Sequence, residues 1–152
     1  MRLVKKLTAK KRLAVIAAAR DLVGVPFLHR GRSERGIDCL GLVVVALASV
    51  GVTTADKRLY GRSPEPEGEE LRRVIVEHFG EPTWGKDQPI ENLKPGTLVT
   101  LQWHGRPNHV AIVGDYLLGG LSLIHADALV GRVVEHRLAD PWPRGIVEGW
   151  LL

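Results

Sequence analysis

The sequence predicts an α+β domain in which N-terminal helices pack on an antiparallel β-sheet of about five strands. Three observations lead to this fold class. The 152 residues are 45% hydrophobic and 25% charged, as in one soluble globular domain. Apolar residues recur at helical spacing in the first half, whereas the second half holds short segments rich in Val, Ile and Leu between turn residues. We therefore assign residues 1–152 to a single domain, of which 1–12 form a basic N-terminal extension.

The first predicted helix begins after Thr8, which can cap it, and runs to about Val23. Gly24 follows its end, and Pro26 prevents the helix from continuing. The residues expected to face the core are Leu13, Ile16, Leu22 and Val23.

Two further helices are expected at 39–50 and 69–79. The first is strongly apolar, follows Asp38 and is closed by Gly51, which indicates a buried helix. The second carries apolar residues at helical spacing after an acidic lead. Between them, the loop 54–70 is rich in Pro, Gly and charge and is interpreted as a connection, with a cover over the site as the alternative.

Five short strands are predicted in the second half, and their close succession favours an antiparallel meander. They are 98–103, 109–113, 121–125, 133–138 and 146–151.

The formal charge of +4 is concentrated at the N-terminus. Such an end favours anionic surfaces, or it is a solvated helix face without a partner. Two Phe, two Tyr and the lack of a recognisable binding motif argue against nucleic acid as a partner. No stretch approaches the roughly 20 apolar residues of a membrane span. The apolar run after the basic start is short, so we expect a mature protein with no signal peptide.

Cys39 is the only cysteine, so an internal disulfide is excluded and the thiol is available to react. It follows Asp38 directly and opens an apolar helix, where the helix dipole and the first N–H groups favour a thiolate and can bind an oxyanion. The alternative is a buried thiol that only packs.

A nucleophilic thiol needs a base and a group that orients this base. His109 begins one predicted strand and His125 ends the next, and neighbouring antiparallel strands can place two such side chains on one face. His78 and His136 are interpreted as structural residues, and His104 is left unassigned.

Five motifs follow one another along the chain: Pro26-Phe27 with a Gly-containing loop, Asp38-Cys39-Leu40-Gly41-Leu42-Val43, Leu93-Lys94-Pro95-Gly96-Thr97-Leu98-Val99, Asn108-His109-Val110-Ala111-Ile112 and Ile124-His125-Ala126. In this order they resemble the motifs of NlpC-type cell-wall cysteine peptidases. The resemblance covers most of the chain, from about residue 14 to the C-terminus. It implies a papain-like fold, no cofactor, and hydrolysis of γ-D-glutamyl to diamino-acid bonds in peptidoglycan stem peptides.

The resemblance maps the nucleophile to Cys39, the general base to His109 and the residue that orients the base to His125. Phe27 stands where the family commonly has Tyr, so the oxyanion site loses a hydroxyl. The Cys39 backbone N–H is then the expected oxyanion donor, with His29 as a second candidate.

Three further residues are expected near the substrate, namely Asp38, Trp103 and Asn108. Asp38 is also expected to cap its helix and to order the preceding loop, without taking part in proton transfer. No metal ligand is expected in this scheme.

Two segments resemble the branch of the family that is encoded in tail clusters of phages and gene-transfer particles: Asp38-Cys39-Leu40-Gly41-Leu42, and the ending from Val134-Glu135 through Trp142-Pro143-Arg144. This resemblance implies a location in a virion tail, made in the host cytoplasm and acting at the cell wall, with other tail-tip proteins as partners.

Three alternatives remain open. The chain can be a structural tail-tip protein with weak or lost catalysis, or a thiol-dependent amidase or acyltransferase on another substrate. The third alternative is a zinc site with Cys39, His109 and His125 as ligands, although no CxxC or paired-histidine spacing supports it.

Overall fold

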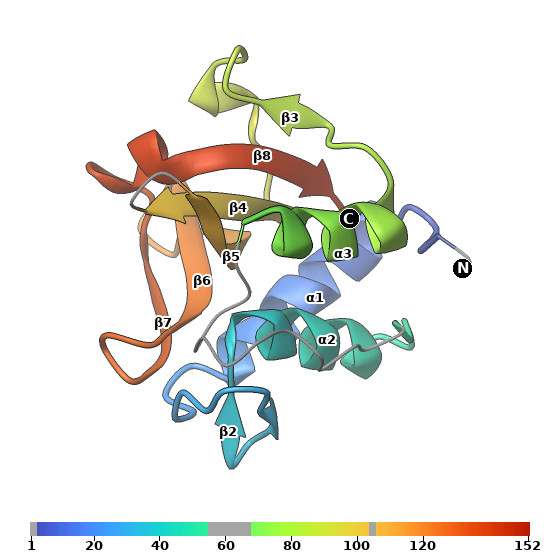
Figure 1. Cartoon of the computed structure of the whole chain (residues 1–152), viewed down its shortest axis with the longest axis vertical. Coiled ribbons are helices and arrows are strands. Elements are labelled where there is room, and N and C mark those ends of the chain that lie inside the picture. The colour runs from blue at the N-terminus through green and yellow to red at the C-terminus, as the bar shows by residue number, and fades with distance from the viewer. Residues whose placement is uncertain (1–2, 55–67, 104–105) are drawn as a thin grey trace.

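The computed structural model describes residues 3–54, 68–103 and 106–152 and has the predicted α+β architecture (Figure 1). Its helices are α1 (Ala9–Asp21), α2 (Cys39–Ser49) and α3 (Gly68–Phe79), with short 3-10 helices η1 (Ile90–Asn92) and η2 (Trp142–Gly145). Its strands are β1 (Arg32–Ser33), β2 (Gly36–Ile37), β3 (Trp84–Gly85), β4 (Thr97–Trp103), β5 (Arg106–Asp115), β6 (Leu121–Asp127), β7 (Arg132–Arg137) and β8 (Ile146–Leu151).

The first helix is confirmed, but two of its predicted core residues are wrong. Thr8 caps α1 by accepting the Lys11 N–H at 3.2 Å. Leu13 and Val23 are 56% and 45% exposed. Val23 lies beyond the end of the helix, and Leu13 points about 120° away from the buried stripe at 100° per residue. The buried residues of this helix are Val15, Ile16 and Ala19, followed by Leu22 just past its end.

The N-terminal segment before α1 belongs to the same packed unit. The Val4 N–H donates to the His78 carbonyl at 2.7 Å, and Leu7 is buried. The Arg12 guanidinium of α1 donates to the Leu7 carbonyl at 2.6 Å and to the Leu152 carbonyl at 3.3 Å, so one side chain joins this segment to Leu152, just past β8.

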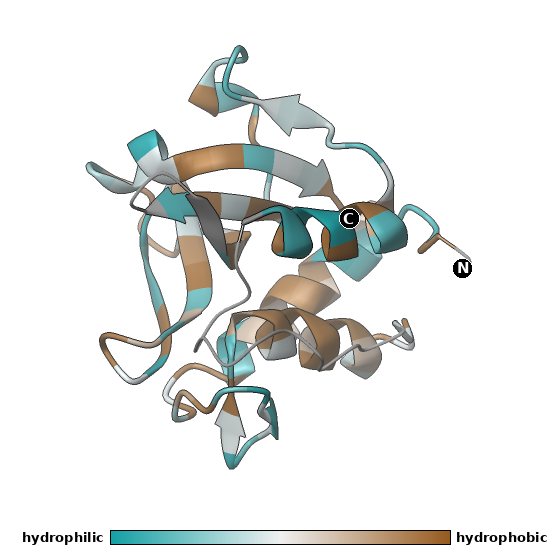
Figure 2. Cartoon of the chain, viewed as in Figure 1, coloured by the Kyte–Doolittle hydropathy of each residue, from teal (hydrophilic) through white to brown (hydrophobic). Residues whose placement is uncertain are grey.

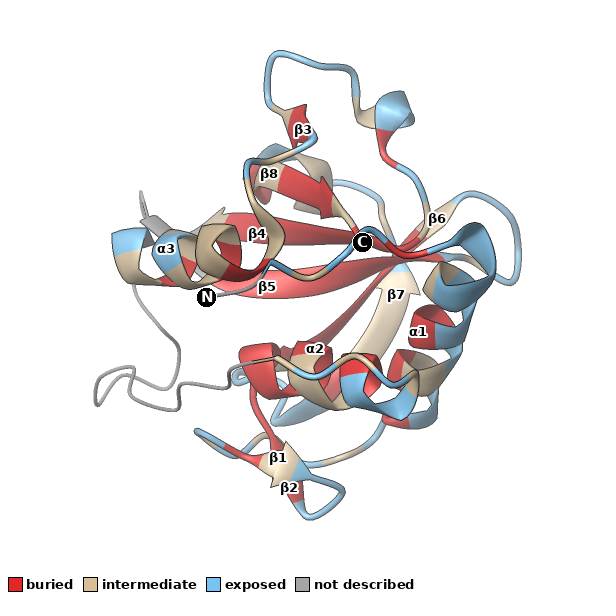
Figure 3. Ribbon diagram, turned by 90° about the vertical axis from the view of Figure 1, so that its right-hand side faces the viewer, coloured by how far each residue is buried: buried red, intermediate tan, exposed pale blue. Residues whose placement is uncertain are grey.

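The second helix is confirmed as the apolar, buried helix of the fold (Figure 2). It packs against α1 and against β5 and β6, and most of its first turn is drawn as buried in Figure 3. The third helix is also confirmed and packs on β5, with Leu71 and Ile75 in the core. The predicted loop 54–70 lies almost entirely outside the described residues.

All five predicted strands are present, but the sheet contains six strands in the order β3-β8-β4-β5-β6-β7, all antiparallel. The meander holds for β4 to β7 only. β8 returns to the other edge of β4, where Leu98 pairs with Trp150. This position buries the Trp150 ring in the core, and its indole N–H donates to the Gly80 carbonyl at 2.9 Å.

The additional strands are short. β3 pairs with β8, and β1 pairs with β2 in a separate hairpin. Each has two residues, too few for the alternating pattern by which a strand is recognised in a sequence.

Alternation along the strands gives the sheet two apolar faces. On β5, Val110 and Ile112 join the core beneath the helices, whereas Ala111 and Val113 join a second cluster on the opposite face. Arg20 ties α1 to the helix-covered face, because its guanidinium donates to both carboxylate oxygens of Glu135 on β7 at 2.8 Å. Within the described residues, no helix is both long and apolar enough to cross a membrane.

Candidate active site

Cys39 is the first residue of α2, and its side chain is completely buried. Asp38 precedes it as the N-cap, accepting the Gly41 N–H at 2.8 Å, as the sequence predicts. The Asp38 carboxylate also accepts the Arg30 N–H and the Arg32 guanidinium, both at 2.8 Å. One buried carboxylate therefore joins the start of the helix to the loop that precedes it.

Gly41 allows this loop to lie close to the helix. A Cβ atom at this position would collide with the Gly31 carbonyl oxygen and would lie 2.9 Å from the Arg32 guanidinium. Gly41 is therefore required because α2 packs closely against the loop that leads into β1.

The strands that carry the two predicted histidines are paired over a short stretch only. The last pair of β5 and β6 is Ile112 with Ile124, and both His109 and His125 lie beyond it. The sheet is interrupted here, although β5 continues beside β4 and β6 continues beside β7. α2 packs against both of the separated strands.

The two histidines meet across this interruption. Nε2 of His109 lies 2.8 Å from Nδ1 of His125, and the rings are nearly perpendicular, at 81°. Both side chains are buried, so this hydrogen bond is shielded from water. The structure thus brings together the two residues that the sequence predicts as the base and its orienting group.

His136, interpreted from the sequence as a structural residue, lies beside this pair. It lies on β7, and its Nε2 is 2.9 Å from Nε2 of His125, while its Nδ1 is 3.0 Å from the Arg137 carbonyl oxygen. His125 pairs with Val134, so His136 is its diagonal neighbour two residues farther along β7. The signal in the sequence is weak, because this proximity depends on the register of β6 and β7.

Trp142, at the start of η2, packs on His125 and His136. The centre of its ring lies 5.0 Å from the His125 ring and 4.5 Å from the His136 ring. Burial, together with the neighbouring His109 and His136, lowers the pKa of His125 to about 2. His125 is therefore neutral throughout the physiological pH range.

The other predicted site residues differ in what the structure shows of them. His29 is half-buried in the loop before β1. The side chains of Trp103 and Asn108 lie outside the part of the chain that the structure describes, as does His104. Substrate contacts of Asp38, Trp103 and Asn108, and the oxyanion role of His29, stay predictions. His78, interpreted as structural, is buried, and its Nδ1 lies 2.7 Å from the Val74 carbonyl.

Metal binding has no support in the geometry of the described residues. Among them, no group of three or more His, Cys, Asp or Glu side chains is arranged to hold a metal ion.

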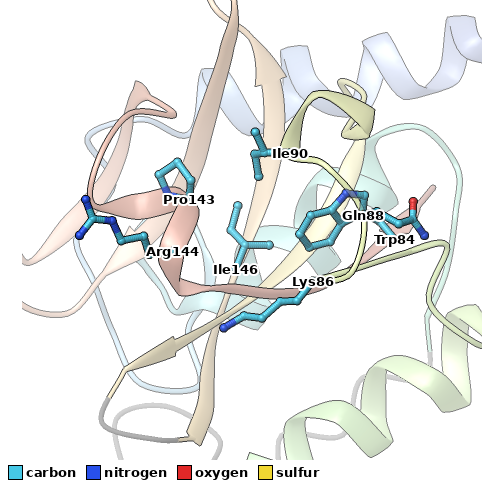
Figure 4. A pocket seen from close by; sticks show the side chains of 7 residues that line it. All are labelled: Trp84, Lys86, Gln88, Ile90, Pro143, Arg144 and Ile146. Carbon is cyan, nitrogen blue, oxygen red and sulfur yellow. The ribbon is translucent and has the colours of Figure 1, made fainter.

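A separate hollow of about 250 Å³ is formed by residues of β3, η1, η2 and β8 and of the segment between β3 and η1 (Figure 4). Its lining residues are Trp84, Lys86, Gln88, Ile90, Pro143, Arg144 and Ile146. Trp142 of η2 packs on the histidines, whereas Pro143 and Arg144 of the same short helix line this hollow.

A comparison with protein families identifies a match over most of the chain. The model of the NlpC/P60 family matches residues 24–144 of the 152. No curated protein matches the sequence.

Solved structures share the fold. The NlpC/P60 domain of the peptidoglycan hydrolase SagA is 19% identical with a TM-score of 0.58, and the match covers 93% of this chain and 98% of that one. An NLP/P60 family protein from Staphylococcus aureus, described as similar to a lipoprotein, is 17% identical with a TM-score of 0.59; the match covers 97% of this chain but only 43% of that protein. RipD from Mycobacterium tuberculosis, described as a non-catalytic NlpC/p60 domain protein adapted to peptidoglycan binding, is 18% identical with a TM-score of 0.53, covering 95% of this chain and 98% of RipD.

Proposed function

Because this chain belongs to the NlpC/P60 family, we propose that it is a cysteine peptidase that cleaves an amide bond in peptidoglycan stem peptides. One observation carries the proposal: the buried hydrogen bond of 2.8 Å between His109 and His125, on the two strands against which the Cys39 helix packs. A histidine held by a second polar group near a cysteine at a helix start is the arrangement that thiol catalysis requires.

In this mechanism His109 is the general base and His125 the positioning residue. Nδ1 of His109 accepts the thiol proton of Cys39 through the interruption between β5 and β6. The sulfur then forms a bond to the amide carbonyl carbon, and the carbonyl electrons move to oxygen. When the tetrahedral intermediate collapses, the C–N bond breaks and His109 gives its proton to the leaving amine.

The thioester left on Cys39 is then hydrolysed. His109 removes a proton from a water molecule, the hydroxide adds to the thioester carbonyl, and the thiolate leaves. The N-terminal position of Cys39 on α2 supports its backbone N–H as a donor to the oxyanion in both steps. Phe27 packs against the core and carries no hydroxyl to add to this site.

The scissile bond in this proposal joins a γ-D-glutamyl group to a diamino acid. Support for this bond comes from the five motifs in the sequence. The likeness to a peptidoglycan hydrolase domain, which covers 98% of that chain, supports peptidoglycan as the substrate. Muropeptide analysis tests this directly: purified peptidoglycan is incubated with the wild-type chain and with Cys39→Ala, and the fragments are identified by chromatography and mass spectrometry. New stem-peptide fragments from the wild type alone are expected, and their termini identify the bond.

We also propose that the protein acts from a phage or phage-like tail tip, in contact with other tail proteins. The support is the resemblance of two sequence segments, around Cys39 and at 134–144, to the tail-cluster branch of the family. Mass spectrometry of purified particles from the source strain tests this location. Finding the chain in particles at a fixed ratio to a tail protein is expected; finding it only in the cell fraction would contradict it.

A non-catalytic, peptidoglycan-binding role is the second candidate. It is favoured by the complete burial of Cys39, because a substrate carbonyl must touch the sulfur for catalysis. The likeness to RipD shows that this fold also occurs in a protein described as non-catalytic. Retention of the chain on insoluble peptidoglycan, with no fragments released from walls of several chemotypes, is the result that this candidate predicts.

A further inference from the structure

Three imidazole rings and one backbone carbonyl form a continuous row of hydrogen bonds. The Arg137 carbonyl oxygen lies 3.0 Å from Nδ1 of His136, whose Nε2 lies 2.9 Å from Nε2 of His125. Nδ1 of His125 in turn lies 2.8 Å from Nε2 of His109. His109 lies on β5, His125 on β6, and both His136 and Arg137 on β7, so strands of the sheet hold all members of the row.

The carbonyl sets the direction of the row, because a carbonyl oxygen can only accept. The same oxygen also accepts the Ala139 N–H at 2.9 Å. Nδ1 of His136 therefore carries a hydrogen. A neutral imidazole has one N–H, so when the ring is neutral its Nε2 is an acceptor.

The positions of the hydrogens on His125 and His109 follow from this. If Nε2 of His136 accepts, Nε2 of His125 must donate. His125 is neutral, so its Nδ1 is the acceptor that faces His109, and Nε2 of His109 must donate to it. The unprotonated nitrogen of a neutral His109 is then Nδ1.

We propose that His136 is a positioning residue of this site, which works with the Arg137 carbonyl to fix the tautomers of His125 and His109 and leaves Nδ1 of His109 as the proton acceptor for Cys39. The inference rests on the proposed function and extends the pair of histidines to a row of three. Protonation of His109 during the reaction needs no change in the row, since its Nε2 hydrogen stays on the bond to His125.

Hydrogen-bond donation in the opposite direction along the row conflicts with the geometry. It would put a hydrogen on Nδ1 of His125 and on Nδ1 of His109, which would then have no lone pair for the thiol proton. With neutral rings it would also place the lone pair of His136 Nδ1 against the Arg137 carbonyl oxygen at 3.0 Å. The Trp142 ring packs on both His125 and His136, and His125 is only 1% exposed, so water has little access to offer the His125 ring other partners.

The first test needs no substrate. Imidazole ¹H–¹⁵N correlation spectra of the Cys39→Ala chain at pH 8 give the tautomer of each ring, with signals assigned from single histidine variants. Nε2–H is expected for His109 and His125, and Nδ1–H for His136. His78, whose Nδ1 lies 2.7 Å from a backbone carbonyl, is an internal reference for the Nδ1–H form. An Nδ1–H form of His125, or an Nε2–H form of His136, would overturn the proposal.

The second test compares two substitutions of similar length. His136→Gln keeps an oxygen that can accept from His125, whereas His136→Met leaves only a thioether sulfur, which accepts weakly. Because Cys39 is the only cysteine, its alkylation by iodoacetamide at about pH 7.5 reports on thiol activation without substrate. A fall of about tenfold is expected for His136→Met, with His136→Gln within about twofold of the wild type.

The outcomes separate this inference from the proposed function. Equal alkylation rates for wild type and a folded His136→Met chain would refute the positioning role. If His136→Met does not fold, the tautomers measured with His136 in place still decide the matter. Failure of the wild type to release muropeptides would count against the proposed function alone, because neither test above depends on peptidoglycan.

Discussion

His109 and His125 are 16 residues apart in the chain, yet their imidazoles share a hydrogen bond of 2.8 Å in a buried position. The bond spans the point at which β5 and β6 cease to pair, after Ile112 and Ile124. Two antiparallel strands that separate at one end thus hold the two rings from opposite sides. The geometry of the proposed base is set by the sheet itself and not by a surface loop.

Replacing His125 should impair catalysis more than it impairs folding. His125→Leu removes the acceptor for Nε2 of His109, so kcat for muropeptide release is expected to fall about 100-fold or more with little change in KM. His125→Asn, which retains a polar acceptor, should lose less. A His125→Leu enzyme with unchanged kcat would show that the hydrogen bond has no part in catalysis.

The neutral state of His125 should make stability depend on pH. Burial lowers its pKa in the folded chain from 6.5 to about 2, so between these values the unfolded chain binds the extra proton. The free energy of unfolding should therefore fall as the pH falls below 6.5, by at most about 1.4 kcal/mol per pH unit from this group. Urea unfolding between pH 4.5 and 7.5 measures the slope. His125→Asn should have a shallower slope, and an identical slope would contradict the assignment.

Removing the Asp38 carboxylate should destabilise the fold strongly. Asp38→Ala deprives the Arg32 guanidinium, only 6% exposed, of this partner and removes the cap of α2. The expected cost is about 3–5 kcal/mol in the free energy of unfolding. Asp140→Ala is the matched control, because its ion pair with Arg144 is exposed on both sides and should matter by less than about 1 kcal/mol. Similar losses for the two variants would contradict this account.

Gly41→Ala should destabilise the chain although alanine favours helices. The new methyl group meets the Gly31 carbonyl and the Arg32 guanidinium, and such overpacking typically costs about 1–3 kcal/mol. Ser49→Ala, near the exposed end of the same helix, loses the hydrogen bond from its hydroxyl to the Ala46 carbonyl but gains helix propensity, so stability should change by no more than about 0.5 kcal/mol. Thermal unfolding of both variants measures the difference in stability. A Gly41→Ala chain as stable as the wild type would show that the loop leading into β1 can move aside.

The elements with a local signal could be predicted from the sequence. Asp38 and Cys39 are adjacent, so the capped start of α2 follows from residue type alone. The meander from β4 to β7 follows from short apolar segments between turns, and it brought His109 and His125 together correctly.

Features that depend on strand register or long-range pairing could not be predicted. The place of β8 beside β4 is set by burial of Trp150 far along the chain. The approach of His136 to His125 depends on a diagonal contact between β6 and β7, which a shift of one residue would abolish. Leu13 was misplaced because an alanine-rich helix offers little contrast between its faces.

The most direct test of the account is the reactivity of the single thiol in the native chain. Iodoacetamide alkylation of Cys39 is followed by intact-protein mass spectrometry at pH 6, for the wild type, for His109→Ala and for the urea-unfolded chain. The account predicts that the folded wild type reacts faster than the unfolded chain and that His109→Ala loses this advantage. A folded wild type that reacts more slowly than the unfolded chain, with no effect of His109→Ala, would mean that Cys39 is a packed core residue and not a nucleophile.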